Sequence, residues 1–254
     1  MRLKVLGCSG GIGPGLRTTA MLADHDVLVD AGTGVGDLAI AELACIDHVF
    51  LTHAHLDHVC CLPLLADAVG RQRAQPLMVH ALAETIEALR RHLFNGQLWP
   101  DFTRLPRPGS PYLQLHEIRT GERVEIAGRG FTAIPAAHTV PAVGYWIDSG
   151  AASLVFSGDT GPNPALWEAV NAIANLRHLL IETAFCDRDC ALALAARHLC
   201  PRLLRHELGM LKRPVQIHVT HLKPADRESL IREIEEAASE YRPQVLAHGQ
   251  VLQF

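Results

Sequence analysis

Lysine is scarce in this sequence: only Lys4, Lys212 and Lys223 occur among 254 residues, and the formal net charge is −4. A protein that binds nucleic acid usually presents a basic face. Arginines do gather between Arg71 and Arg107. The shortage of lysine therefore argues against a nucleic-acid partner without excluding one.

The seven cysteines form no CxxC pair, and no apolar run reaches the length of a membrane span. An odd number of cysteines without a regular spacing is typical of reduced thiols in the cytosol. Residues 1–7 read as a strand and do not have the pattern of a signal peptide. We therefore expect a cytoplasmic protein that does not associate with membranes.

Charged residues are also few, at 20%, while hydrophobic residues make up 48% of the chain. This composition is sufficient for a full hydrophobic core and carries no signature of disorder. Neither a low-complexity linker nor a break in composition divides the sequence. We therefore expect a single domain over residues 1–254.

Histidine is the residue in excess, with 15 copies, and three of them fall with one aspartate in the stretch 51–58, Leu-Thr-His-Ala-His-Leu-Asp-His. An apolar run at 46–51 precedes this stretch and predicts a strand, and residues 59–69 predict a helix that follows it. The end of a strand that opens into a helix can hold a site rigidly.

The spacing within this stretch indicates metal ligands. In an extended chain His53, His55 and Asp57 point to one side, and the turn into the helix would bring in His58. One metal could then bind His53 and His55, and a second Asp57 and His58. Imidazole with a carboxylate suits zinc, although iron and manganese also accept it. The competing interpretation is a polar loop whose histidines are satisfied by hydrogen bonds.

Strands and helices alternate along the rest of the chain, which favours an α/β or α+β fold. The expected strands are 2–6, 18–22, 27–29, 46–51, 76–79, 112–118, 123–126, 130–135, 144–148, 153–157, 179–182, 215–221 and a last one from 244–248 on to 254. The expected helices are 35–44, 59–69, 82–93, 164–174, 189–199, 202–211 and 226–239.

Polar residues recur where apolar strands stop, which suggests one rim of a sheet. They are His138, Asp159, Glu182 and His221. Asp30 also ends a strand, where a carboxylate can support a ligand-bearing loop.

Two loops and the remaining histidines allow more than one interpretation. The glycine-rich segment 7–15 lacks the Lys-Ser/Thr ending of a phosphate-binding loop, so a plain loop is favoured, although it could line a pocket. The aromatic segment 94–102 could stack on a planar base, but anchoring of the loop is favoured. His80 and His248 could line the rim, and His218 favours a buried, hydrogen-bonded role. The others are expected at the surface or as caps: His25, His48, His92, His116, His178 and His206.

With these residues in hand, the chain resembles the metallo-β-lactamase superfamily, and within it most closely the class II cyclic-nucleotide phosphodiesterases. The segments that carry the likeness are His53 to His58, Phe94-Asn95 with Trp99 to Phe102, Ser157 to Pro162, Ile181 to Phe185, Arg197 to Pro201 and His221 to Pro224. The resemblance implies a four-layer αββα sandwich with the site on one edge.

The resemblance also implies roles for individual residues. One divalent metal ion, most simply Zn²⁺ with Mn²⁺ or Fe²⁺ as alternatives, would bind His53, His55 and His138. A second would bind Asp57, His58 and His221, and Asp159 would bridge the two. The catalytic residues implied are Asp57, Glu182 and His198, with His198 as proton donor and Glu182 as its partner.

The activity implied is hydrolysis of the 3′ ester of a small 3′,5′-cyclic nucleotide (cAMP or cGMP) by a metal-bridging hydroxide. The chain could act as a homodimer. Three alternatives remain open: a tRNA 3′-end processing phosphodiesterase, another hydrolase of this fold, and a non-hydrolytic metalloprotein. Redox relatives usually carry glutamate where His55 stands, so the histidines favour hydrolysis.

Overall fold

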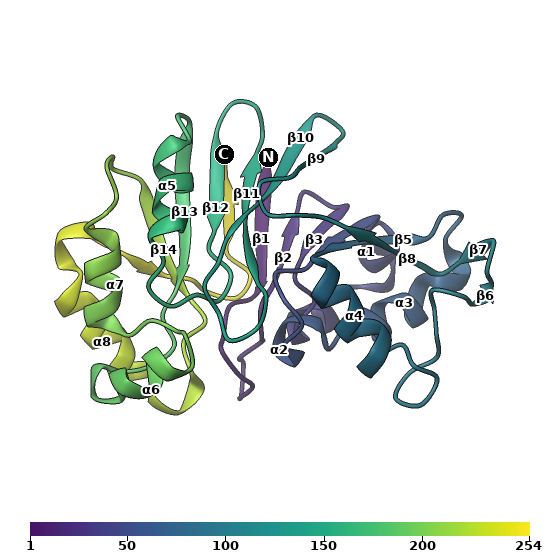
Figure 1. Ribbon diagram of the computed structural model, residues 1–254, viewed down its shortest axis with the longest axis horizontal. Helices are drawn as coiled ribbons and strands as arrows, with labels where there is room; N and C mark the ends of the chain where they lie inside the picture. The colour runs from purple at the N-terminus through teal and green to yellow at the C-terminus, as the bar shows by residue number, and fades with distance from the viewer. The chain divides into compact units, whose positions relative to one another are not determined.

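The computed structural model describes residues 1–254, and the chain divides into two compact units (Figure 1). The first unit contains residues 1–7, 17–119 and 248–253, and the second contains 8–16, 120–247 and Phe254. The single domain expected over 1–254 stays a prediction. None of the helices has both the length and the apolar character that a membrane crossing requires.

The first unit contains a mixed seven-stranded sheet in which both ends of the chain pair: β16 lies beside β1 (Figure 1). The strands β3, β4, β5 and β8 run parallel to one another. The order is β16 (Val251–Gln253), β1 (Arg2–Gly7), β2 (Ala20–Ala23), β3 (Val27–Val29), β4 (His48–Phe50), β5 (Leu77–Ala81) and β8 (Leu113–Glu117).

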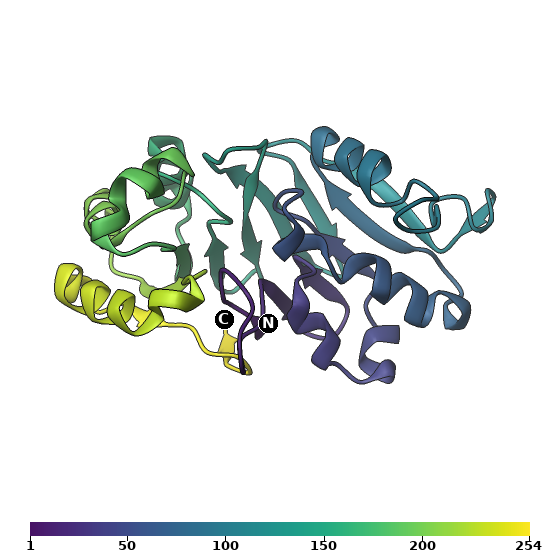
Figure 2. The same ribbon diagram turned by 90° about the horizontal axis from the view of Figure 1, so that it is seen from below.

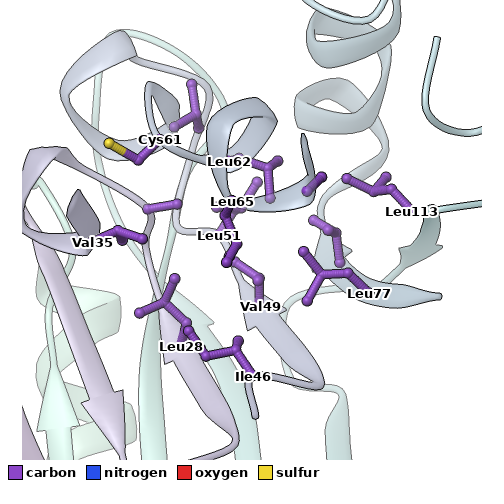
Figure 3. Close-up of a cluster of buried hydrophobic side chains, with 14 of the residues drawn as sticks. Leu28, Val35, Ile46, Val49, Leu51, Cys61, Leu62, Leu65, Leu77 and Leu113 are labelled. Atoms are coloured by element: carbon purple, nitrogen blue, oxygen red, sulfur yellow. The ribbon is translucent and has the colours of Figure 1, made fainter. Parts of the chain in front are cut away.

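Helices of the first unit pack on apolar strand residues at one face of this sheet. Figure 3 shows Val49 and Leu51 of the β4 region against Leu62 and Leu65 of a helix, within one buried cluster. Burying each such side chain stabilises the fold by roughly 1.5–3 kcal/mol. The helical segments are η1 (Thr33–Asp37), α1 (Ile40–Ala44), α2 (Leu56–Val59), α3 (Leu62–Val69), η2 (Gly70–Gln72) and α4 (Ala83–His92), and β6 (Pro106–Arg107) pairs with β7 (Ser110–Pro111).

The second unit also contains a seven-stranded sheet, in which β10, β12, β13 and β14 run in one direction. Its order is β15 (Gln244–Val245), β14 (Gln216–Thr220), β13 (Leu176–Glu182), β12 (Ser153–Phe156), β11 (Val143–Asp148), β10 (Arg129–Pro135) and β9 (Arg123–Ile126). The strand β15 runs in the same direction, so residues that follow any of these five strands lie at the same edge of the sheet.

Helices gather on one face of the second sheet as well (Figure 2). Leu179 and Ile181 of β13 pack with Leu204 and Leu230 of two of these helices. Asn163 caps the first of them through its side-chain oxygen, and Pro164 begins it. The helical segments are α5 (Pro164–Ala172), η3 (Asp187–Asp189), α6 (Cys190–Ala195), α7 (Pro201–Leu208), η4 (Pro224–Asp226), α8 (Arg227–Ala237) and η5 (Ser239–Tyr241).

The helix expected at 59–69 is wrong at its start, because the structure forms α2 and α3 with a break at Cys60 and Cys61. The backbone N–H of Cys61 donates to Ala31, so it leaves the helical ladder. Pro63 has no N–H to continue that ladder. Consequently Asp57 and His58 already lie on a helix.

Three further expectations differ from the structure. The helix at 35–44 is interrupted, since Leu38 and Ala39 are extended and Glu42 caps a new helix at the Ala39 N–H. The helix at 189–199 ends at Ala195. The last strand is two strands: a turn at Gly249, with φ +80°, separates β15 of the second sheet from β16 of the first.

Candidate metal centre

The four predicted ligands of the stretch 51–58 lie close together in the first unit. His53 and His58 are fully buried, whereas His55 and Asp57 are partly exposed. The ring centre of His53 lies 4.6 Å from that of His55 and 4.3 Å from that of His58. His58 Nε2 lies 3.8 Å from Asp57 Oδ2. The strand end therefore gathers four donor groups, as the spacing predicts.

Asp30 and Thr52 support this stretch through hydrogen bonds. Asp30 follows β3, and its carboxylate accepts hydrogen bonds from the Thr52 N–H at 2.8 Å and from His58 Nδ1 at 2.7 Å. The Thr52 hydroxyl donates to Asp30 at 2.9 Å, and its oxygen lies 3.0 Å from His53 Nδ1. Burial raises the pKa of Asp30, although His58 and Thr52 oppose that shift. Asp30 thus supports the ligand stretch, as expected.

The second unit gathers the other predicted residues at one edge of its sheet, where β10, β12, β13 and β14 end. His138, Asp159 and His221 are all buried, with at most 4% of each exposed. His221 Nδ1 lies 3.3 Å from Asp159 Oδ1. Donor atoms of His138, Asp159 and His198 all lie within 4.8 Å of one another. The polar rim expected from the strand ends is confirmed within this unit.

The predicted pair of Glu182 and His198 forms in the second unit. Glu182 ends β13 and is fully buried, and its Oε1 lies 2.6 Å from His198 Nδ1. The same carboxylate accepts the backbone N–H groups of Thr160 and Leu199. Burial alone would lower the pKa of His198, but the charge of Glu182 and the hydrogen bond to it raise the pKa overall. The hydrogen bond to Glu182 therefore favours the protonated form of the imidazole and fixes its direction.

The glycine-rich segment 7–15 makes contacts with His221 that the interpretation as a plain loop does not include. The His221 N–H donates to Cys8, and the Gly10 N–H donates to Leu222. A Cβ on Gly10 would lie 2.5 Å from the His221 carbonyl oxygen and 2.9 Å from His221 Cδ2. The loop therefore packs directly against a predicted metal ligand.

The anchoring role of the aromatic segment is supported, because Phe94 and Phe102 are buried and Trp99 packs on the core of the first unit. His218 is buried and hydrogen-bonded to His178, as expected. The surface position expected for His178 is wrong, since only 4% of it is exposed. His80 is buried, with its Nε2 3.0 Å from His48 Nδ1.

His248 is exposed, and its Nδ1 donates to the Leu6 carbonyl at 2.8 Å. Neither His80 nor His248 belongs to a group of three candidate ligands. These two histidines are therefore not assigned to the metal centre.

The donor set fits metal ions by its chemistry. In His53, His58 and His138, Nδ1 is engaged by an oxygen of Thr52, Asp30 and Arg197 respectively. A ring that donates from Nδ1 keeps its lone pair on Nε2, and such outer partners are typical of metal-binding histidines. Neutral imidazoles beside carboxylates are the ligands of zinc and similar divalent ions.

A family model for the β-lactamase superfamily domain matches residues 25–246 of the chain. The chain belongs to the metallo-β-lactamase superfamily. The metallo-β-lactamase fold protein YhfI from Bacillus subtilis superposes with a TM-score of 0.78 at 18% identity, over 99% of this chain and 98% of the other. The α/β sandwich class expected from the sequence is thereby confirmed, and superfamily membership implies a hydrolase with divalent metal ions.

Two curated relatives within the superfamily carry names that describe an activity. A probable 3′,5′-cyclic-nucleotide phosphodiesterase of Yersinia pestis is 26% identical over 206 residues, covering 71% of this chain. A ribonuclease Z of Mycobacterium marinum is 28% identical over 166 residues, covering 61% of this chain. The matched regions span 58% and 60% of these relatives' own lengths.

Sequence reasoning gave no role to Thr52, Thr160 or Arg197. Thr52 directly precedes His53. The sequence alone could therefore have indicated that the Thr52 hydroxyl reaches the ring of His53. Thr160 follows Asp159, and its hydroxyl oxygen accepts the N–H of Ala137. Arg197 contacts His138 across 59 residues of sequence, so no local pattern could indicate that contact.

Proposed function

We propose that the protein is a binuclear metal-dependent phosphodiesterase that hydrolyses the 3′ ester of 3′,5′-cyclic nucleotides. The observation that carries this proposal is the buried pair of Glu182 and His198, beside His138, Asp159 and His221. Hydrolysis of an alkyl phosphodiester needs a proton for its alkoxide leaving group. A protonated, oriented imidazole next to candidate metal ligands supplies that proton.

The seven predicted ligands divide between two metal ions in this proposal. One ion would be held by His53, His55 and His138, the other by Asp57, His58 and His221, and Asp159 would be shared by both. The groupings follow the resemblance to the superfamily. Zinc is the metal proposed, because five histidines and two aspartates match its ligand preference.

When bound, two such ions activate water at neutral pH and neutralise charge on the phosphoryl oxygens. The remaining steps of the reaction use side chains of the protein. His198 gives its Nε2 proton to the departing 3′ oxygen, so that water adds to phosphorus and a 5′-monophosphate forms. Glu182 holds Nδ1–H of His198 and stabilises the charged ring before the transfer. Asp57 acts beside the ions as a ligand and orienting carboxylate.

The relatives support this substrate class without deciding it. The Yersinia relative is named as a probable cyclic-nucleotide phosphodiesterase, and its match covers more of this chain than that of the Mycobacterium ribonuclease Z. The net charge of −4 also favours a small phosphate ester over a long polyanion. A cytoplasmic location, where such nucleotides occur, and a homodimeric state belong to the same proposal.

A second candidate is an RNA-processing phosphodiesterase, which the ribonuclease Z relatives favour. It would use the same ligands and the same proton donor, since the chemistry at phosphorus is shared. The two candidates differ in affinity for RNA. Binding to precursor tRNA that falls steeply with salt would favour the second.

The test is a side-by-side assay of the zinc-loaded protein on cyclic AMP, cyclic GMP and a precursor tRNA, with an activated bis-nitrophenyl phosphate as the common control. We expect turnover of a cyclic nucleotide and of the activated ester. Cleavage of the tRNA with no turnover of either cyclic nucleotide would replace the first candidate by the second.

A further inference from the structure

Arg197 and His138 are joined by hydrogen bonds in both directions. The guanidinium of Arg197 donates from Nη1 to the backbone carbonyl of His138 at 2.7 Å. In return, His138 Nδ1 lies 3.1 Å from the backbone carbonyl of Arg197 and donates to it. His138 is 4% exposed, whereas Arg197 is exposed, and both bonds are part-buried. The bond from the charged guanidinium is stronger than one between neutral groups.

The backbone conformation of Arg197 contributes to its contact with His138. Arg197 adopts a left-handed conformation with φ +52°, which costs a non-glycine residue about 1 kcal/mol or more. It follows the end of α6, where the His198 N–H donates to Ala193 rather than continuing the helix. A glycine would adopt this conformation without strain. In Arg197 the backbone carbonyl accepts the Nδ1–H of His138, and the side chain bonds to the backbone of the same histidine.

A neighbouring glycine leaves room for the arrangement. A Cβ on Gly161 would lie 3.3 Å from Arg197 Cα, and the Gly161 N–H donates to Ala137 at 2.9 Å. The segment that carries His138 is therefore held between two loops of the second unit. One loop carries Asp159, and the other carries Arg197 and His198.

We propose that Arg197 is a positioning residue that fixes the tautomer and direction of His138 for metal binding. Its left-handed backbone aims a carbonyl at Nδ1, and its side chain holds the backbone of the same histidine. The proton is thereby kept on Nδ1, and the Nε2 lone pair is presented to a divalent cation. This inference rests on the metal centre proposed above and does not depend on which ester the protein hydrolyses.

The experiment compares three substitutions on the full-length protein: Arg197→Gly, Arg197→Lys and Arg197→Val. Glycine keeps the left-handed backbone and loses only the guanidinium bond. Lysine keeps a cationic donor, and valine opposes the left-handed conformation and so displaces the carbonyl as well. Zinc affinity is measured by competition with a chromogenic chelator, without substrate. We expect a loss of about tenfold for glycine, less for lysine and up to about 100-fold for valine.

Arg242 provides a matched control, because it is also a left-handed arginine, with φ +48°, and is exposed outside the candidate centre. Arg242→Val should lower the melting temperature through the same backbone strain and leave zinc affinity unchanged. Equal zinc affinities for wild type and Arg197→Gly, or equal losses for the two valine variants, would overturn the proposal.

A second readout uses the metal-free protein and no catalysis. Two-dimensional nitrogen–proton spectra of the imidazole rings report which nitrogen of His138 carries the proton. We expect the Nδ1–H form in wild type and a mixture of forms in Arg197→Val. A wild-type ring protonated on Nε2 would contradict the proposal, whereas failure to hydrolyse any phosphodiester would contradict only the proposed function.

Discussion

In the candidate centre, hydrogen bonds to the Nδ1 atoms of four histidines fix the direction of their rings. His53, His58, His138 and His198 each have an oxygen within 3.1 Å of Nδ1, from a hydroxyl, a carboxylate or a backbone carbonyl. In the proposed function, Nε2 of the first three would bind a metal, and Nε2 of His198 would donate a proton. The kind of partner does not separate the proposed ligands from the proposed acid, because His58 and His198 both bond to a carboxylate.

His198 is the residue whose removal separates acid catalysis from metal catalysis. We expect His198→Ala to slow cyclic-nucleotide hydrolysis by about 10²–10⁴, because the 3′ alkoxide needs a proton. A nitrophenyl ester should lose much less, since its leaving group is stable without one. Steady-state rates on both substrates check this, and equal losses would show that His198 is not the acid.

Gly10 tests the support of His221 by the glycine-rich loop. A methyl group at Gly10 would meet the His221 backbone and ring below 3 Å, so either the loop or the ligand must move. We expect Gly10→Ala to lose about 1–3 kcal/mol of stability and to weaken the binding of one metal ion. Denaturant unfolding and metal competition measure the two effects.

Gly109 has open space around its Cβ position and provides the control for that experiment. Gly109→Ala should leave both quantities as in wild type. A Gly10→Ala variant with unchanged metal affinity would show that the loop only covers His221.

At the scale of strands, each sheet carries a histidine pair between adjacent parallel strands, and His80, His178 and His218 of these pairs are buried. His48 Nδ1 lies 3.0 Å from His80 Nε2 across β4 and β5, and His178 Nδ1 lies 3.1 Å from His218 Nε2 across β13 and β14. Burial, and then the neighbouring histidine, lowers the pKa of His80 to about 3 and that of His218 to about 4. His80 and His218 are therefore neutral at pH 7.

These pairs predict loss of stability in acid. An unfolded histidine takes up a proton near pH 6.5, whereas His80 in the folded protein does so only near pH 3. Stability is therefore fully present above pH 6.5 and falls as the pH drops from 6.5 toward 3. At pH 5 the loss from His80 is on the order of 1–2 kcal/mol.

Urea unfolding of the metal-free protein at pH 7.5 and pH 5 measures this loss. His80→Leu should show a smaller difference between the two pH values than wild type, and the exposed His206→Leu should behave as wild type. An unchanged difference in His80→Leu would refute the role of the pair.

The local sequence pattern predicted most helices and strands. It failed where a backbone N–H bonds to a residue far away in the sequence. Strand ends could be predicted because apolar runs stop at His138, Asp159 and His221. The break at Cys61 could not, because its N–H goes to Ala31, 30 residues earlier in the chain. The burial of His178 depends on a strand partner, His218, and Phe254 at the chain end. The Arg197 contact is likewise set by tertiary structure alone.

At the scale of the whole molecule, the proposed ligands are distributed over both units of the chain. Four of the proposed ligands come from the first unit and three from the second. Superfamily membership spans both units, since the family match runs from residue 25 to 246.

The most direct test of the binuclear account is a metal titration of the metal-free protein, followed by hydrolysis of bis-nitrophenyl phosphate. Turnover should be absent at the start, rise as zinc is added and saturate at about two ions per chain. Full turnover by the protein without any metal would contradict the account.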